Sequence, residues 1–163
     1  ICLFADGLPI LVDAGGDIHS LPLVDGAAPR TILQTPPATD ADFNEERDIL
    51  TADLSGIYPD NAMPAAYQRT LMTLRRDGTV RLVDAFEFIQ PPQALTFRFV
   101  TALRPEIGAD GVRLGTVLLS WDGDMAAEAA PLGSAAFPDA HLLSFRMTNP
   151  PRRLICGFTF ELI

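Results

Sequence analysis

Two histidines and a short acidic run are the groups in this sequence that best fit metal binding or acid–base chemistry. His19 follows Asp13 and Asp17 in a polar segment between two apolar stretches, residues 8–12 and 21–24. A carboxylate at a strand end and an imidazole a few residues later can supply two metal ligands, and such oxygen and nitrogen donors favour zinc. Asp13 and His19 are therefore the candidate metal ligands. The alternative is a polar turn whose Asp and His side chains bond nearby backbone groups.

The other charged candidates have simpler interpretations. Either histidine could serve a Ser-His-Asp arrangement, whose members need not be close in sequence. His141 stands at the head of an alternating stretch, so a surface or strand-end histidine is the simpler interpretation. The pairs Arg75-Arg76 and Arg152-Arg153 border predicted turns and fit solvated strand ends. Recognition of a carboxylate or sulfate is the alternative, because the guanidinium fork matches such groups.

Local enzyme motifs are absent from the sequence. It contains no GxSxG elbow, no glycine-rich phosphate loop, no HExxH and no EF-hand pattern. Trp121 and Tyr67 could stack on a sugar ring, although single aromatic residues in strands more often belong to the core or its rim. The sequence thus offers side chains that could bind a ligand but no self-contained catalytic motif.

The elements that would position these residues are strands. Apolar residues recur with period two in segments 95–99, 143–147 and 154–162. Such alternation places every second side chain on the buried face of a half-exposed sheet. The same windows fit a helical period of 3.6 poorly.

Turn signals separate the predicted strands. Asp77-Gly78 lies between strands around residues 71–75 and 80–88, which predicts a β-hairpin. Proline pairs, which cannot continue a central strand, mark three further connections at 36–37, 91–92 and 150–151. This punctuation predicts about ten to twelve strands, more than one flat sheet normally holds. We therefore expect an all-β fold, an antiparallel β-sandwich of two packed sheets.

Helices and cysteines are minor features of this prediction. Residues 60–67 are a weak helical candidate that Pro64 reduces to a loop or single turn, and the Ala-rich segment 125–130 could also be helical. Cys2 and Cys156 have no metal-type spacing. We expect two small buried side chains, with a disulfide between terminal strands as the alternative.

Size and charge limit the possible partners. A chain of 163 residues with 48% hydrophobic residues fits one domain with one core, covering residues 1–163. The net charge of −9 argues against nucleic acid and against an anionic membrane surface. No apolar run approaches the roughly 20 residues that cross a bilayer. The chain opens directly on a strand-like run, as expected of the later part of a longer polypeptide.

Several segments together resemble a known family. The opening ICLFADGLPILVDAGG, followed by IHSLPLVDG, resembles the start of the C-terminal sheet domain of heparinase II/III-like polysaccharide lyases. In that family a strand reading roughly "adGxplLvDsG" precedes a stretch reading roughly "HNxlxvdG". The segments 52–59 and 67–86 and the closing CGFTFELI are also similar to that domain, so the resemblance covers nearly the whole chain.

The resemblance implies a two-part enzyme. An N-terminal α/α toroid would supply a catalytic Tyr and further histidines, and the sandwich would form one wall of the cleft. Acidic, uronate-containing polysaccharide would be cleaved by β-elimination, and a periplasmic or extracellular location is implied. Some members hold zinc, and Asp13 and His19 match the metal-ligand pattern. The ligand set is incomplete in this chain, because the family's HxH-D segment normally lies before the position of Ile1.

Two other function classes remain open at this point. The first is a carbohydrate-binding or structural sandwich without a catalytic share, since fold likeness does not establish activity. The second is a glycosidase with paired carboxylates, for which the 21 acidic residues offer many pairs and select none.

Overall fold

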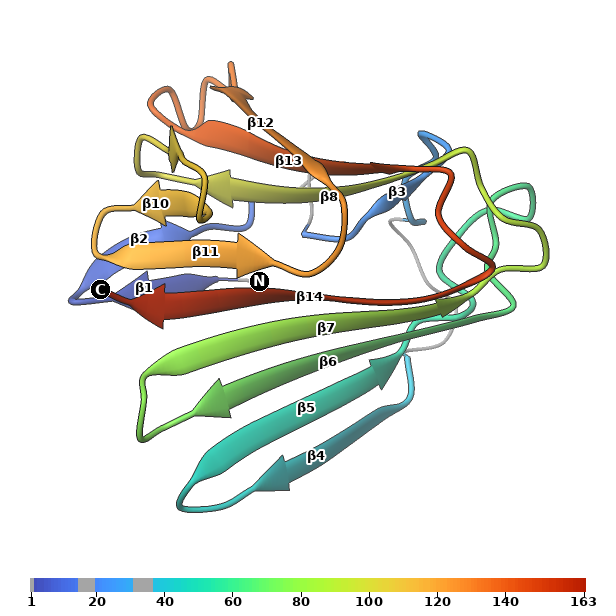
Figure 1. Ribbon diagram of the computed structural model, residues 1–163, viewed down its shortest axis with the longest axis horizontal. Helices are drawn as coiled ribbons and strands as arrows, with labels where there is room; N and C mark the ends of the chain where they lie inside the picture. Colours follow the sequence, from blue (N-terminus) through green and yellow to red (C-terminus); the bar gives the residue numbers. More distant parts are fainter. Residues whose placement is uncertain (1, 15–19, 31–36) are drawn as a thin grey trace.

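Two stacked antiparallel sheets form the body of the molecule (Figure 1), as the residue alternation predicts. The computed structural model describes residues 2–14, 20–30 and 37–163. The larger sheet has eight strands in the order β4-β5-β6-β7-β14-β11-β10-β9. These strands are β4 (Thr39–Phe43), β5 (Arg47–Asp53), β6 (Ala66–Leu74), β7 (Thr79–Glu87), β9 (Glu106–Ile107), β10 (Val112–Leu114), β11 (Val117–Trp121) and β14 (Arg153–Leu162).

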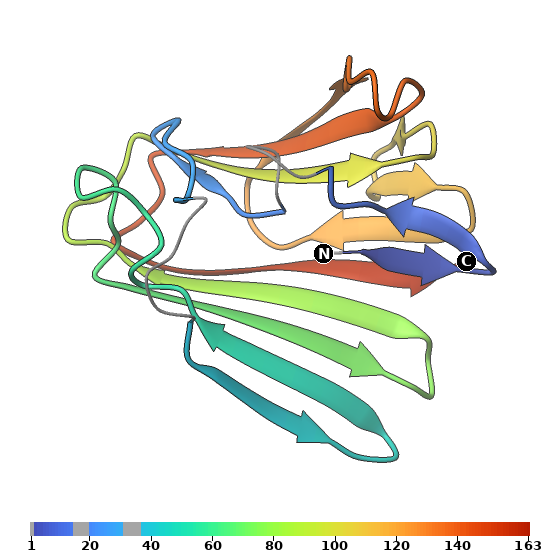
Figure 2. The same ribbon diagram turned by 180° about the vertical axis from the view of Figure 1, so that it is seen from behind.

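The smaller sheet has four strands in the order β12-β13-β8-β3. They are β3 (Leu23–Val24), β8 (Ala94–Thr101), β12 (Ala126–Pro131) and β13 (His141–Thr148). A separate hairpin, β1 (Leu3–Ala5) and β2 (Leu8–Leu11), turns through Asp6 and Gly7, both at positive φ. The hairpin lies beside the ends of β11 and β14 (Figure 2), where Leu3 shares a small cavity with Val117 and Phe160.

An aromatic cluster joins the two sheets. Phe97, Phe99 and Phe145 of the smaller sheet meet Phe158 of β14 edge to face, with ring centroids 5.0 to 5.1 Å apart. All four side chains are buried. Edge-to-face packing suits the ring quadrupoles, so these contacts stabilise the sandwich beyond the area that they bury.

The β6–β7 hairpin confirms the Asp77-Gly78 prediction. Leu74 pairs with Thr79 across the turn, and Gly78 has φ +63. The two strands are nine residues each and lie inside the larger sheet, between β5 and β14. They carry the buried polar residues of the candidate site described below.

Neither helical candidate forms a helix, and the described part of the chain contains none. Segment 125–130 instead contributes to β12, where Ala126 to Pro131 pair with β13. Cross-strand pairing outweighs the helix propensity of this Ala-rich segment. Segment 60–67 forms turns and the start of β6. No helix able to span a membrane is found in the residues that the structure describes.

The expectation of two buried cysteines is half right. Cys156 is buried and Cys2 is exposed, and neither is in a disulfide. Burial, together with the nearby Asp84 carboxylate, raises the pKa of the Cys156 thiol to about 12. Since the thiolate is the reactive form, Cys156 is an inert core side chain.

Candidate functional site

The two ends of segment 13–20 are attached to different sheets. Before it, the Val12 amide donates a 2.9 Å hydrogen bond to the Val100 carbonyl, beside the smaller sheet. At its last residue, the carbonyl of buried Ser20 accepts a hydrogen bond from Arg69 of β6, in the larger sheet. The segment that carries the candidate metal ligands is therefore tied to both walls of the sandwich.

Asp84 fixes the Arg69 side chain that holds Ser20. The guanidinium of Arg69 donates two 2.7 Å hydrogen bonds, one to each carboxylate oxygen of Asp84 on β7. Asp84 is fully buried and Arg69 is 9% exposed. Burial alone would lower the pKa of Arg69, but the adjacent Asp84 carboxylate outweighs it and the pKa is raised. This bidentate pair fixes the geometry of the Arg69 side chain, because two parallel hydrogen bonds to one carboxylate define the orientation of the guanidinium.

Two buried tyrosines complete this network. The Tyr67 hydroxyl donates to Asp84 at 2.9 Å, and the Tyr58 hydroxyl donates to the Pro22 carbonyl at 2.6 Å. Burial raises the pKa of both hydroxyls, and Asp84 adds to the effect. Both tyrosines therefore remain protonated hydrogen-bond donors and are not general bases at neutral pH.

Sequence reasoning missed the roles of Arg69, Asp84 and Tyr58. The sequence did contain a signal for Arg69 and Asp84, because each stands at an inward-facing position of an alternating strand. Arg69 is two residues from Leu71, and Asp84 is two residues from Leu82. A charge at such a position has to be paired inside the core. Which residue pairs with which depends on the β6–β7 register, where Arg69 is opposite Asp84.

The two aromatic candidates belong to the core and its rim, the simpler interpretation of the sequence. Tyr67 is fully buried, and its ring stacks on Phe86 with centroids 4.2 Å apart. Trp121 is half-buried and packs against Phe145 at 4.9 Å. The sugar-stacking interpretation is therefore wrong for Tyr67, and Trp121 belongs to the rim of the core.

The remaining basic candidates lie at strand ends, as their simpler interpretation predicts. Arg75 pairs with Asp48 at 2.5 Å, and Arg152 and Arg153 both approach Glu87, at 3.9 and 3.1 Å. These arginine side chains are at least half exposed, so each pair contributes about 0–1 kcal/mol to stability. His141 is the first residue of β13 and is half-buried.

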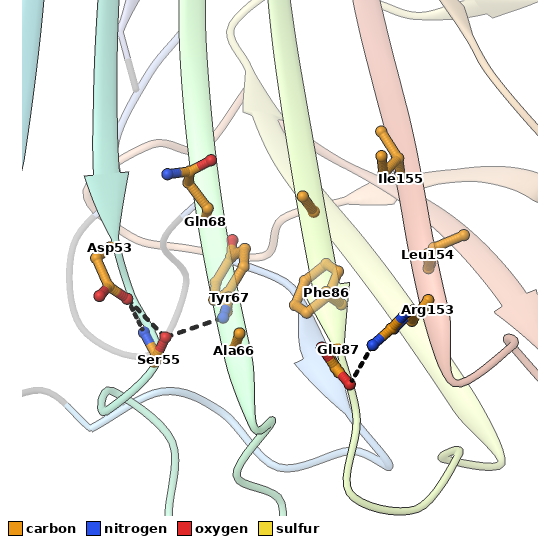
Figure 3. Close-up of a pocket in the computed structure, with 11 residues that line it drawn as sticks. Asp53, Ser55, Ala66, Tyr67, Gln68, Phe86, Glu87, Arg153, Leu154 and Ile155 are labelled. Carbon is orange, nitrogen blue, oxygen red and sulfur yellow. Dashed lines mark hydrogen bonds and ion pairs between the residues drawn. The ribbon is translucent and has the colours of Figure 1, made fainter.

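A groove of about 690 Å³ crosses one end of the larger sheet on its outer face (Figure 3). Its lining residues come from the β5 end and from β6, β7 and β14: Asp53, Ser55, Ala66, Tyr67, Gln68, Ala85, Phe86, Glu87, Arg153, Leu154 and Ile155. Ser55 donates to Asp53 through its hydroxyl at 2.6 Å and through its amide at 3.0 Å, and these bonds lower the pKa of Asp53. Since Glu87 pairs with Arg153, the groove contains both signs of charge and offers an acidic polysaccharide no net attraction.

The predicted metal site is only partly within the described residues. Asp13 is exposed, directly after Val12, and His19 lies outside the described ranges. Within residues 2–14, 20–30 and 37–163, no three His, Cys, Asp or Glu side chains form a group that could hold a metal ion. Zinc binding by Asp13 and His19 therefore stays a prediction.

Comparison with solved structures shows what the fold is similar to. The structure superposes on the crystal structure of heparan sulfate lyase HepC from Pedobacter heparinus with a TM-score of 0.64, over 98% of this chain. The chain has the fold of one part of a heparan sulfate lyase. The match covers 29% of the lyase chain at 13% sequence identity. A mutant of the same lyase gives a TM-score of 0.61 at 14% identity, over 99% of this chain and 30% of that one.

The comparisons by sequence found no match, whereas the comparison by structure did. No family model and no curated protein matches the chain. The resemblance to the sheet domain of heparinase II/III-like lyases is confirmed at the level of the fold, and the chain spans less than a third of the lyase that it matches.

Proposed function

We propose that this chain is the sheet domain of a polysaccharide lyase that cleaves uronic-acid-containing polysaccharide by β-elimination. One observation carries the proposal: nearly the whole chain superposes on part of a heparan sulfate lyase, and most of that lyase lies outside the match. An α/α toroid domain of the same protein would supply the catalytic base and the other wall of the cleft.

The proposed reaction needs two kinds of group. Neutralising the uronate carboxylate acidifies the neighbouring C–H, and a positioned base then removes that proton. Neither buried tyrosine of this chain can be the base, because Tyr58 and Tyr67 do not reach a substrate and their pKa values are raised. The contribution of the sheet domain would be to position segment 13–20, through the bond from Arg69 to the Ser20 carbonyl.

Asp13 and His19 are the proposed zinc ligands of this chain. A carboxylate oxygen and an imidazole nitrogen suit zinc, and the remaining ligands would come from outside the chain. The zinc would stabilise the loops on the side of the sandwich that faces the cleft. Ser20, the residue after His19, is buried and held by Arg69, which would limit the positions open to a ligand at residue 19.

Metal content and lyase activity of the full-length protein test this proposal. We expect Asp13→Ala and His19→Ala to lower bound zinc and the ultraviolet-absorbing unsaturated product. The loss of metal affinity should be at least the ~10–100-fold that follows the loss of a residue that only supports a ligand. His141→Ala is the matched control, because it removes the other histidine, at the start of β13. The isolated 163-residue chain should release no unsaturated product.

The alternative function is a carbohydrate-binding or structural sandwich without metal. It predicts that Asp13→Ala and His19→Ala leave zinc content and activity of the full-length protein unchanged. Lyase activity from the isolated chain would contradict both functions, because it would require a complete catalytic set within these 163 residues.

A further inference from the structure

The smaller sheet ends in an edge strand, β12, that has a neighbour on one side only. The strand order β12-β13-β8-β3 leaves the other side of β12 unpaired within the described part of the chain (Figure 1). β9 of the larger sheet approaches β12 but forms no strand pair with it. Five of the six β12 residues are exposed, and all except Glu128 and Pro131 are alanines. An exposed edge of this kind is a template on which another strand can pair.

The hydrogen-bond pattern shows which backbone groups face the exposed edge. Just after β12, the Leu132 amide donates to the Ala140 carbonyl at 2.8 Å, and the antiparallel register along β12 is unbroken. Bonded residues alternate along an antiparallel pair, so the even-numbered residues of β12 bond β13. The backbone groups of Ala127 and Ala129, and the carbonyl of Pro131, therefore point away from β13 toward the exposed edge.

Pro131 occupies one of these outward-facing positions. Proline has no N–H, so a strand that pairs with β12 finds no donor at this residue. A proline at position 130 would instead remove a bond within the sheet, because the Ala130 amide faces β13. Pro131 thus weakens pairing at the exposed edge and leaves the pair between β12 and β13 intact.

Glu128 lies in the middle of β12, on the outer face of the smaller sheet. It is opposite Ser144 of β13, whose neighbours Leu143 and Phe145 are buried in the core. Successive side chains of a strand point to opposite faces, so Ser144 and Glu128 point away from the core. A strand that pairs with β12 therefore has to place one of its own side chains beside the exposed Glu128 carboxylate.

Two copies of β12 can pair antiparallel about a two-fold axis at Glu128 or at Ala129. With the axis at Glu128, the amides of Ala127 and Ala129 find acceptors, but the two Glu128 side chains are directly opposite, in a non-hydrogen-bonded pair where side chains are closest. With the axis at Ala129, the two Glu128 residues are diagonal neighbours about 7–8 Å apart. In that register Ala127 donates to the Pro131 carbonyl of the other copy, and Pro131 returns no bond. Both registers therefore combine acceptable backbone geometry with like charges, which destabilise a strand pair.

We propose that Glu128 and Pro131 prevent the exposed edge of β12 from pairing with β12 of a second copy of this chain. Charged side chains and proline are devices by which edge strands avoid edge-to-edge association. Here the two residues act on different groups: Glu128 on the side chains that meet across the edge, and Pro131 on the backbone donors. The inference goes beyond the proposed lyase function and does not depend on it, because it rests on the strand geometry and charge of this chain alone.

Self-association of the full-length protein, measured by sedimentation over a range of concentrations, tests the proposal. Glu128→Val with Pro131→Val should lower the dissociation constant for self-association at least about tenfold, because it removes the like-charge contact and adds an outward-facing donor to each copy. Glu45→Val is the matched control. Glu45 is exposed between β4 and β5, so its substitution removes the same charge without changing β12.

A charge swap separates the charge of residue 128 from its strand propensity. Glu128→Arg alone should associate no more than the wild type, because Arg then meets Arg across the edge. An equal mixture of wild type and Glu128→Arg should form mixed dimers, because opposite charges then face each other. Far-ultraviolet circular dichroism of each variant should match that of the wild type, since the Glu128 side chain is exposed.

Two results would overturn the proposal. One is Glu128→Val/Pro131→Val protein that self-associates no more strongly than the wild type and Glu45→Val. The other is a mixture of wild type and Glu128→Arg that associates no more than either protein alone, which would mean that the charge of residue 128 does not control pairing. Lyase activity and zinc enter neither readout, so a failed function would not be confused with a failed edge.

Discussion

Arg69 and Asp84 place two opposite charges inside an otherwise apolar core. Removing two ions from water is expensive, and their attraction compensates only when the geometry is good and the remaining donors and acceptors are satisfied. Here the pair is bidentate at 2.7 Å, and Tyr67 and the Ser20 carbonyl take up further bonds. A hydrophobic pair could stabilise the core equally well, so we interpret this pair as a device that holds the Ser20 backbone.

Single substitutions of this pair should be strongly destabilising. We expect Arg69→Met or Asp84→Leu to lower the free energy of unfolding by about 3–5 kcal/mol each, because either leaves a buried charge without its partner. The double variant should lose far less than the sum of the two. Urea unfolding of all four proteins measures the coupling.

Tyr67→Phe provides the comparison within the same network. It removes one donor to the Asp84 carboxylate and should cost about 1.5–3 kcal/mol, the usual range for a hydrogen bond to a charged group. If the double variant instead loses the full sum of the unfolding free energies lost in Arg69→Met and Asp84→Leu, the two charges do not interact. That result would contradict the interpretation of Arg69 and Asp84 as a coupled pair.

Among the elements, the β10–β11 hairpin depends on one glycine. Gly111 precedes β10 with φ +148, a conformation that L side chains rarely adopt. A Cβ placed there would lie 2.5 Å from the Leu119 carbonyl oxygen of β11 and 3.2 Å from the Leu118 side chain. Both a strained backbone and a backbone clash therefore exclude any larger residue.

Gly111→Ala should lower the free energy of unfolding by at least about 1–3 kcal/mol, the usual cost of a strained backbone conformation. Gly56→Ala is the control, because its Cβ would meet nothing within 4 Å and its φ is not in the positive range. Thermal denaturation compares the two variants. Equal stability of both would show that the backbone around Gly111, between β9 and β10, adjusts freely.

Strands that alternate strictly could be predicted from the sequence, and their partners could not. The period-two runs ending at Phe99, Met147 and Leu162 became β8, β13 and β14 because one face of each is buried. The sequence did not clearly predict β12, because Ala126 to Ala130 show no alternation of apolar and polar residues. The segment becomes a strand by pairing with β13. The placement of β14 between β7 and β11 joins segments far apart in the chain, which local patterns do not specify.

The candidate site was less predictable than the fold. Local sequence identified Asp13 and His19 as possible ligands, but the anchor of their segment depends on Arg69, about 50 residues later. The core was the simpler interpretation for Tyr67, and burial confirms it, but an aromatic residue on a strand gives no sign of which face it occupies until the register is known. Its neighbours Phe86 and Asp84 on β7 reveal that face.

At the scale of the whole molecule, one core serves both sheets. The rings of Phe97, Phe99 and Phe145 from the smaller sheet share contacts with Phe158 of the larger one. Neither sheet could keep these rings from water by itself, so separating the sheets and unfolding the strands should be one event. Trp121 stands at this junction, on β11 of the larger sheet and against Phe145 of the smaller.

We therefore expect the chain to unfold in a single cooperative transition. Trp121 is the only tryptophan, so its fluorescence reports contact between the sheets, while far-ultraviolet circular dichroism reports the strands themselves. In urea the two signals should change at the same midpoint, because a shared core leaves no stable state with separated sheets. Trp121→Phe should abolish the fluorescence change and keep the dichroism transition. A fluorescence midpoint clearly below that of dichroism would mean that the sheets part before their strands unfold, and that residues 1–163 do not behave as one domain.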